Sequence, residues 1–191
     1  MRAYIIHGNT RKKSNTEALA KLFSEELSEK GVEVVQISLR EKNIQTCVGC
    51  YACHSVLDSF GCVINDDMQV VAAEILAADL VVLTSPIYSW MPTPPLKAVM
   101  DRIYAFTKYP ENGDAFNLLK NQKFAMIATS GSDCKTNCDL FDESVRRMAK
   151  FGKLHYLGYI AALASDVKNG ITDAVASDAR KFAGECVDAI A

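Results

Sequence analysis

Hydrophobic residues along the chain form two kinds of run, and the two kinds alternate. Short continuous apolar runs predict strands over residues 3–6, 32–37, 79–84, 124–128 and 156–163. Apolar residues that recur every three or four positions predict helices over 18–27, from 66 onward, from 93 onward, over 141–151 and over 171–190. Strands that alternate with helices predict an α/β fold, with a parallel sheet covered by helices on both faces.

Two of the predicted helices carry clear start signals. Ser14 and Glu17 have the spacing of a capping box at the start of the first helix. Thr93 is placed as the N-cap of the third helix, and Pro94 takes its first position.

Length and composition are those of a globular domain. The chain has 191 residues, of which 49% are hydrophobic and 23% charged, and these values exclude a disordered or fibrous protein. No repeat or low-complexity linker is present, so we expect one domain over residues 1–191, with a cysteine-rich loop over residues 45–65. The net charge of −2 supplies no field that would gather nucleic acid or an anionic membrane surface.

The cysteine count bears on the compartment. Seven cysteines, an odd number, include four within a window of sixteen residues, a pattern that fits a reduced protein with a metal or redox site better than a secreted disulfide framework. Met1 and Arg2 lead directly into the first apolar strand, and no apolar stretch reaches the length of a membrane span. We therefore expect a cytoplasmic protein.

Ligands of such folds lie at the carboxyl ends of the strands, where the strand order reverses. The loop over residues 7–16 places hydroxyl, amide and basic side chains around a helix N-terminus, which favours a bound phosphate. The same residues also serve as a simple helix cap with solvated lysines. The loop over residues 84–95 holds the only tryptophan, a tyrosine and four prolines, so it is either a rigid wall for a planar ligand or a stiff connector.

The cysteine window offers a soft metal site. Cys47, Cys50 and Cys53 form a C-x₂-C-x₂-C run of the kind that binds iron–sulfur clusters, and Cys62 follows after eight further residues. Zinc is an alternative, with His54 as a further ligand, and so are free thiols or a redox disulfide.

Three stretches together resemble the flavodoxin-like NADPH-dependent FMN reductase family. Residues 8–16 are similar to its G-S-x-R-x-x-S-x-T phosphate loop, with Asn9 in place of the serine, and residues 85–88 and 95–102 are similar to its P-x-Y loop and K-x-x-x-D-R helix. The resemblance implies a doubly wound five-stranded parallel sheet of order 2-1-3-4-5. It implies that the FMN phosphate is held by Asn9, Arg11, Ser14, Asn15 and Thr16, with the amide of Asn9 as a donor.

The same resemblance extends to the flavin ring. It implies that the isoalloxazine is lined by Pro86, Ile87, Tyr88, Ser89 and Trp90, and that Ser130 and Gly131 close the pocket.

The cysteine window is similar to the iron–sulfur flavoprotein branch of that family. This likeness implies a 4Fe–4S cluster with the ligands Cys47, Cys50, Cys53 and Cys62. The last gap is slightly longer than is usual in that branch, and no proline follows Cys62.

The resemblance implies an FMN-dependent NAD(P)H oxidoreductase. NAD(P)H or a reduced carrier protein would donate electrons to FMN, and a quinone, an aromatic compound, oxygen or an iron–sulfur cluster would accept them. A homodimer or homotetramer is expected from the family. The alternatives are a flavodoxin-type electron-transfer module without its own small substrate, and a regulator that binds a flavin or metal without turnover.

The remaining cysteines and histidines receive no catalytic role. Cys134 and Cys138 flank the loop after the fourth strand, where a redox pair is less favoured than an incidental one. Cys186 lies on the apolar face of the last helix and is expected in the core. His7 and His155 have no visible acidic or nucleophilic partner, so no acid–base residue is assigned.

Overall fold

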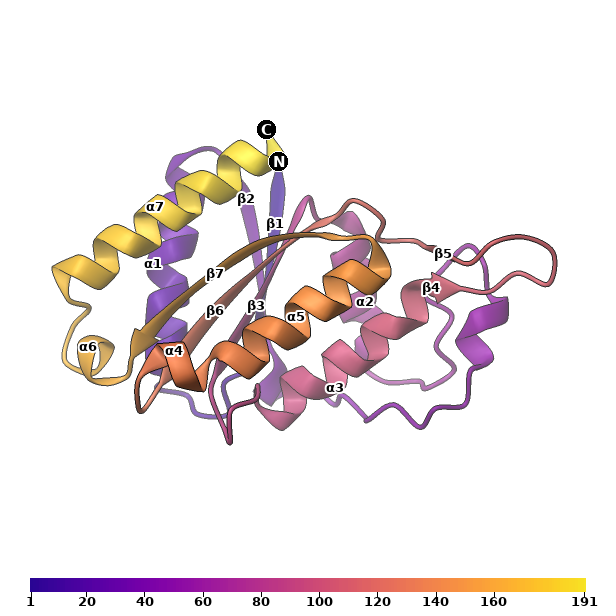
Figure 1. Ribbon diagram of the computed structural model, residues 1–191, viewed down its shortest axis with the longest axis horizontal. Helices are drawn as coiled ribbons and strands as arrows, with labels where there is room; N and C mark the ends of the chain where they lie inside the picture. The colour runs from indigo at the N-terminus through magenta and orange to yellow at the C-terminus, as the bar shows by residue number, and fades with distance from the viewer.

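The computed structural model describes residues 1–191 and shows a parallel sheet between two layers of helices (Figure 1). The strands of this sheet are β1 (Arg2–His7), β2 (Glu33–Ser38), β3 (Leu80–Pro86), β6 (Lys123–Ser130) and β7 (His155–Leu163). Their order is β2-β1-β3-β6-β7 and every pairing is parallel. Counted along the chain, this is the predicted order 2-1-3-4-5, so the flavodoxin-like fold is confirmed.

Two helices cover one face of the sheet and three cover the other. The first layer contains α1 (Asn15–Glu29) and α7 (Asp173–Ile190), and the second contains α2 (Met68–Ala77), α3 (Pro94–Ile103) and α5 (Asp139–Gly152) (Figure 1). No helix combines the length with the apolar character that a membrane span requires.

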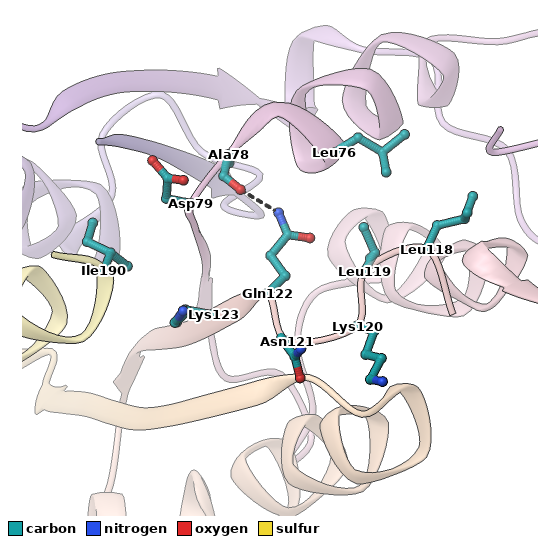
Figure 2. A pocket seen from close by; sticks show the side chains of 10 residues that line it. All are labelled: Leu76, Ala78, Asp79, Leu118, Leu119, Lys120, Asn121, Gln122, Lys123 and Ile190. Carbon is teal, nitrogen blue, oxygen red and sulfur yellow. Dashed lines mark hydrogen bonds between the residues drawn. The ribbon is translucent and has the colours of Figure 1, made fainter. Parts of the chain in front are cut away.

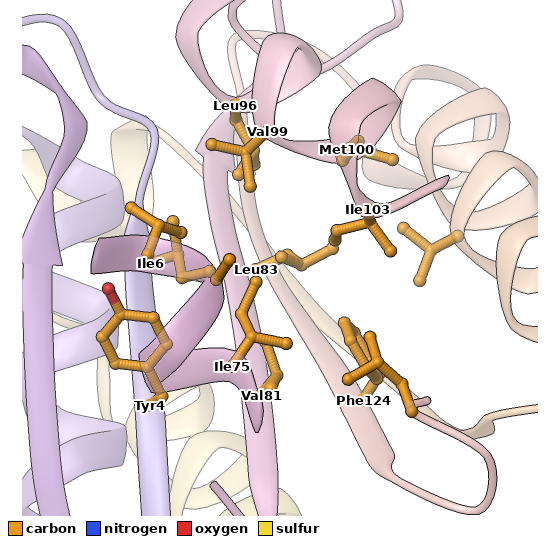
Figure 3. Close-up of a cluster of buried hydrophobic side chains, with 14 of the residues drawn as sticks. Tyr4, Ile6, Ile75, Val81, Leu83, Leu96, Val99, Met100, Ile103 and Phe124 are labelled. Carbon is orange, nitrogen blue, oxygen red and sulfur yellow. The ribbon is translucent and has the colours of Figure 1, made fainter. Parts of the chain in front are cut away.

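The central strands are buried on both faces, which explains their continuous apolar runs. In β1, Ala3 and Ile5 join the core beneath α1 and α7, whereas Tyr4 and Ile6 join the core beneath the other three helices. Figure 3 shows this second core, where Ile6 lies beside Leu83 of β3 and Tyr4 is in register with Val81. The two cores hold the sheet rigidly, so the loops at its carboxyl edge start from fixed positions.

The structure adds short elements that periodicity could not reveal. They are β4 (Thr107–Lys108), β5 (Phe116–Asn117), α4 (Cys134–Asn137), α6 (Ser165–Lys168), η1 (Leu39–Glu41), η2 (Ala52–Ser55) and η3 (Tyr104–Phe106). Elements of two to four residues contain too few apolar positions to show a period. Ile171, expected on the last helix, lies before α7 begins and still packs against the core.

The two predicted helix starts differ from expectation in their side-chain bonds. Ser14 caps α1, since its hydroxyl accepts a hydrogen bond from the backbone N–H of Glu17 at 3.4 Å. The Glu17 carboxylate does not complete a capping box, because it binds Asn9 and Arg40 instead. Thr93 occupies the N-cap of α3 but does not cap it; its hydroxyl donates to the carbonyl of Gly8 at 2.5 Å.

Gly8 joins three elements at the end of β1. Its N–H donates to the carbonyl of Thr84 on β3 at 2.8 Å, and its carbonyl accepts from Thr93 at the start of α3. A β-carbon at this position would lie 2.7 Å from the β-carbon of Leu96 and 3.0 Å from the Thr84 carbonyl oxygen. Only glycine therefore permits the loop after β1 to approach α3 so closely.

We expect Gly8→Ala to destabilise the protein by about 1–3 kcal/mol, because the added methyl group forces backbone and side chains apart in a packed region. Urea unfolding followed by circular dichroism measures this change. Gly131→Ala is the matched control, since nothing lies within 4 Å of a β-carbon built at Gly131. Equal stability of the two variants would contradict the close approach at Gly8.

Candidate functional site

A large cleft opens at the carboxyl ends of β1, β3 and β6. Its cavity of about 1160 Å³ is lined by residues 9–18 after β1, 86–88 after β3 and 129–131 at the end of β6. The chain order of the strands reverses between β1 and β3, and this is the position where doubly wound sheets bind their ligands.

A second hollow, at the amino edge of the sheet, is smaller. It has a volume of about 290 Å³, and Figure 2 shows Asp79, Lys120 and Gln122 around it. The side-chain amide of Gln122 donates hydrogen bonds to the carbonyls of Ile75 and Ala78, and these bonds connect the end of α2 to the start of β6. This hollow lies away from the switch point between β1 and β3, and it does not have the basic rim of the large cleft.

The floor of the large cleft is the N-terminus of α1. Thr16, in the first turn, is buried, and its hydroxyl contacts that of Thr129 on β6 at 2.5 Å. The first-turn N–H groups and the positive end of the helix dipole favour an anion at this place. The rim is basic, since five cationic side chains and one carboxylate, Glu17, line the cleft; the cations are Arg11, Lys12, Lys13, Lys21 and Lys168.

Asn9 lines the cleft with its side-chain amide already bonded within the protein. Its side chain is 1% exposed, and its Nδ2 donates to the carbonyl of Arg11 at 2.8 Å and to the carboxylate of Glu17 at 2.9 Å. Arg40 holds the same carboxylate at 3.1 Å. Both amide protons of Asn9 are therefore bonded within the protein, where they hold the loop to Arg11 and Glu17. Its Oδ1 is a buried acceptor without a partner.

The loop after β3 contributes only its first half to the cleft. Pro86, Ile87 and Tyr88 line the cavity, and the hydroxyl of Tyr88 contacts that of Thr10 across it at 3.2 Å. Ser89 and Trp90 lie outside, at the tip of a tight turn. Both have left-handed backbone conformations, with φ of 49° and 65°, and Trp90 is 53% exposed.

The other sequence-predicted residues of the cleft come together. Arg11, Ser14, Asn15, Thr16, Ser130 and Gly131 all line it. Sequence reasoning missed Ala164, Val167 and Lys168, which enter from the segment after β7, where Ala164 accepts a hydrogen bond from Asn15 at 3.1 Å. No sequence motif identifies this segment as part of the cleft. It reaches the cleft because β7 pairs with β6 and ends beside it.

His7 lies beneath the cleft in a closed hydrogen-bond arrangement. Its Nε2 pairs with the side-chain oxygen of Gln36 at 2.8 Å, and its Nδ1 pairs with the hydroxyl of Thr84 at 3.2 Å. Burial lowers the pKa of the His7 imidazole. Both ring nitrogens of His7 are therefore occupied by protein groups.

The four clustered cysteines line a single small cavity near the C-terminal end of α3. The cavity has a volume of about 40 Å³, and Cys47, Cys50, Cys53 and Cys62 share it with Arg102. No three histidine, cysteine, aspartate or glutamate side chains anywhere in residues 1–191 converge closely enough to hold a metal ion. The four cysteines thus line one cavity and have the sulfur donors that an iron–sulfur centre needs. Their side chains do not converge into a formed metal site.

His54 does not belong to this thiol cavity. Its ring packs among those of Tyr51, Tyr104 and Tyr109, with centroid distances of 5.1, 5.4 and 4.4 Å. The zinc alternative that used His54 as a ligand therefore gains no support from its position.

Arg102 fastens the cysteine loop to α3. Its guanidinium donates to the carboxylate of Asp66 at 2.5 Å and to the sulfur of Cys62 at 3.3 Å, and the side chains of Arg102 and Asp66 are 1% and 0% exposed. Burial alone would raise the pKa of Asp66, but hydrogen bonds from Arg102 and from two backbone N–H groups outweigh it, so the pKa lies below its ordinary value.

The remaining three cysteines are not reactive thiolates. Burial raises the pKa of the Cys134 thiol, and it raises that of Cys138 to about 12. Burial also raises the pKa of Cys186 to about 12, in the core position predicted for it. Because thiolates are the reactive form of cysteine, these protonated groups show no sign of redox activation.

The sheet order and the cleft at its switch point define a flavodoxin-like fold. The sequence profile of the family described as NADPH-dependent FMN reductase matches residues 1–139, and the chain belongs to that family.

Individual relatives agree with this membership. The chain is similar to an iron–sulfur flavoprotein of Methanocaldococcus jannaschii, with 32% identity over 53% of this chain and 51% of that one. It is also similar to an uncharacterised NAD(P)H oxidoreductase of Haemophilus influenzae, with 30% identity over 74% of this chain and 70% of that one. The chain thus spans about half the length of the first of these relatives.

A solved structure shows the same fold. It is an FMN-dependent NADH-azoreductase from Bacillus anthracis in complex with FMN, with a TM-score of 0.63, 20% identity, and coverage of 98% of this chain and 97% of that one.

We expect Arg102→Met to destabilise the protein by about 3–5 kcal/mol, because it leaves the buried Asp66 carboxylate without its cation. Lys97→Met is the control on the same helix, since Lys97 pairs with Asp101 at the surface, with exposures of 44% and 48%. That variant is expected to lose less than about 1 kcal/mol. Comparable losses in urea unfolding would show that the Arg102–Asp66 pair is not the buried anchor of the cysteine loop.

Proposed function

We propose that the chain is an FMN-dependent NAD(P)H oxidoreductase. The observation that carries this proposal is the N-terminus of α1, which opens with a basic rim into the cleft at the switch point of the sheet. A phosphate at this place would meet Arg11, Ser14, Asn15 and Thr16. Membership of the NADPH-dependent FMN reductase family supports the same ligand.

The rest of the cleft suits the remaining parts of FMN. Pro86, Ile87 and Tyr88 offer a rigid, partly apolar wall for the isoalloxazine, and Ser130 and Gly131 offer polar backbone opposite it. The unpartnered Oδ1 of Asn9 suits a hydroxyl donor such as those of the ribityl chain. FMN, when bound, accepts a hydride from a nicotinamide and passes the electrons on.

The partners of the reaction follow from this assignment. NAD(P)H or a reduced carrier protein is the proposed donor, and a quinone, an aromatic compound, oxygen or an iron–sulfur centre is the proposed acceptor. We propose a homodimer or homotetramer in the cytoplasm. The exposed ring of Trp90, beside the cleft and outside it, supports a second copy that completes the pocket.

We further propose that the four cysteines bind a 4Fe–4S cluster. All four cysteines line one cavity, and Arg102 donates a hydrogen bond to the sulfur of Cys62, a type of contact that tunes iron–sulfur centres. Similarity to proteins named iron–sulfur flavoproteins supports this choice over zinc.

The FMN assignment predicts a phosphate-specific effect of Arg11→Met. We expect about tenfold weaker FMN binding, or about 1.4 kcal/mol, and unchanged binding of riboflavin, which has no phosphate. Flavin fluorescence titrations measure both. Lys150→Met, which removes one positive charge from an exposed site on α5, should alter neither affinity.

The same preparations test the reductase assignment. Anaerobic stopped-flow mixing of the FMN-loaded protein with NADH and with NADPH should bleach the flavin absorbance with at least one of them. A loss of riboflavin affinity equal to that of FMN would contradict the phosphate site. Flavin that binds but stays oxidised with both nicotinamides would overturn the reductase in favour of an electron-transfer module.

The cluster assignment predicts that Cys50→Ser loses iron. Anaerobic reconstitution of the wild type should give about four iron atoms per chain and the broad absorbance of an iron–sulfur cluster, and the variant should retain neither in full. Cys186→Ala, in the core of the other face, should load normally. Full iron content in Cys50→Ser would remove Cys50 from the ligand set, and a wild type without iron would end the cluster proposal.

A further inference from the structure

Lys108 is a buried lysine beneath the cysteine loop. Its exposed fraction is 0%, and it lies on the short strand β4, which follows α3 and η3. Its ammonium donates to the backbone carbonyl of Cys53 at 3.1 Å and to that of Phe60 at 3.2 Å. Both carbonyls belong to the cysteine loop, between the third and fourth clustered thiols, so the ammonium lies directly under the segment that presents them.

The charge of Lys108 has no counter-ion. Its two partners are neutral carbonyls, and none of the ion pairs of the chain includes it, whereas the neighbouring buried cation Arg102 is paired with Asp66. Two buried cations, Arg102 and Lys108, thus contact the cysteine loop, and only one buried anion, Asp66, pairs with either of them.

An uncompensated buried charge is costly, and folded proteins normally pair it. Two carbonyls would be satisfied as well by a neutral donor, so hydrogen bonding alone does not account for an ammonium at this place. The unpaired charge of Lys108 therefore points to a nearby anion that is not one of the carboxylate side chains of the protein.

We propose that Lys108 is the counter-cation of an anionic, thiolate-ligated centre held by Cys47, Cys50, Cys53 and Cys62. The proposal rests on the proposed function of the cysteine site and adds a positioning residue to it. Each thiol that binds a metal loses its proton, and four thiolates outweigh the charge of a divalent ion or of an iron–sulfur core. The surplus negative charge then lies above the ammonium of Lys108.

A consequence for reduction follows from charge alone. If reduced flavin were to give such a centre one electron, the centre would gain one negative charge and release no group. A fixed cation nearby stabilises a reduced form more than an oxidised form, so Lys108 would raise the reduction potential of the centre.

Lys108→Met keeps the length of the side chain and removes its charge. We expect the reconstituted variant to be at least tenfold harder to reduce, which corresponds to about 59 mV for a one-electron couple. Anaerobic redox titration, monitored by electron paramagnetic resonance, measures the midpoint. Lys181→Met makes the same charge change on α7, in the helix layer on the other face of the sheet, and should leave the midpoint unchanged. Lys108→Arg keeps the charge and should load iron.

Each outcome decides the role of Lys108. A lower midpoint in Lys108→Met, or loss of iron in Lys108→Met with loading in Lys108→Arg, supports it. An unchanged or raised midpoint overturns it. Loss of iron in both variants would show that shape, not charge, is required, and would overturn it as well.

Cadmium separates this proposal from the cluster assignment. Cd²⁺ is a thiolate-binding ion, and its ligand-to-metal absorbance in the ultraviolet reports binding to the wild type even when no iron is incorporated. At least tenfold weaker Cd²⁺ binding in Lys108→Met than in Lys181→Met would support the role of Lys108 although the cluster had failed. Equal Cd²⁺ affinity in the two variants would overturn it.

Discussion

The close approach of the loop after β1 to α3 is the constraint on which the rest of the molecule depends. Gly8 bridges β3 and α3 through its own backbone, and a side chain there would collide with Leu96. This contact fixes where α1 begins and where α3 begins, and therefore where the cleft opens. The ligand-binding edge is thus a product of backbone packing as much as of the polar side chains that line it.

Helix α3 connects the two candidate sites. Thr93 at its N-terminus contacts the cleft loop through Gly8, and Arg102 near its C-terminus holds the cysteine loop through Asp66 and Cys62. Arg102 follows Thr93 by nine positions along the helix, a rise of roughly 14 Å. The two sites are therefore distinct in a single chain, yet one rigid element sets the position of both.

Buried charge distinguishes the two sites. The cleft keeps its cations on an open rim, where water screens them until an anion arrives. The cysteine loop instead rests on two cations that are removed from water, Arg102 and Lys108. Such an arrangement is costly unless negative charge lies nearby, and among the charged side chains only Asp66 supplies it by pairing with Arg102.

The sequence by itself determined the architecture and most of the cleft. Continuous apolar strands, helical periods and the cap at Ser14 are local features, and the loops after β1 and β3 follow from them. Only the tertiary structure decided that Trp90 lies outside the cleft and that the amide protons of Asn9 bind Arg11 and Glu17. It also decided that Lys108 lies beneath the cysteine loop without a counter-ion. These outcomes depend on contacts between segments far apart in the chain, and a local pattern contains no information about which partner a side chain will meet.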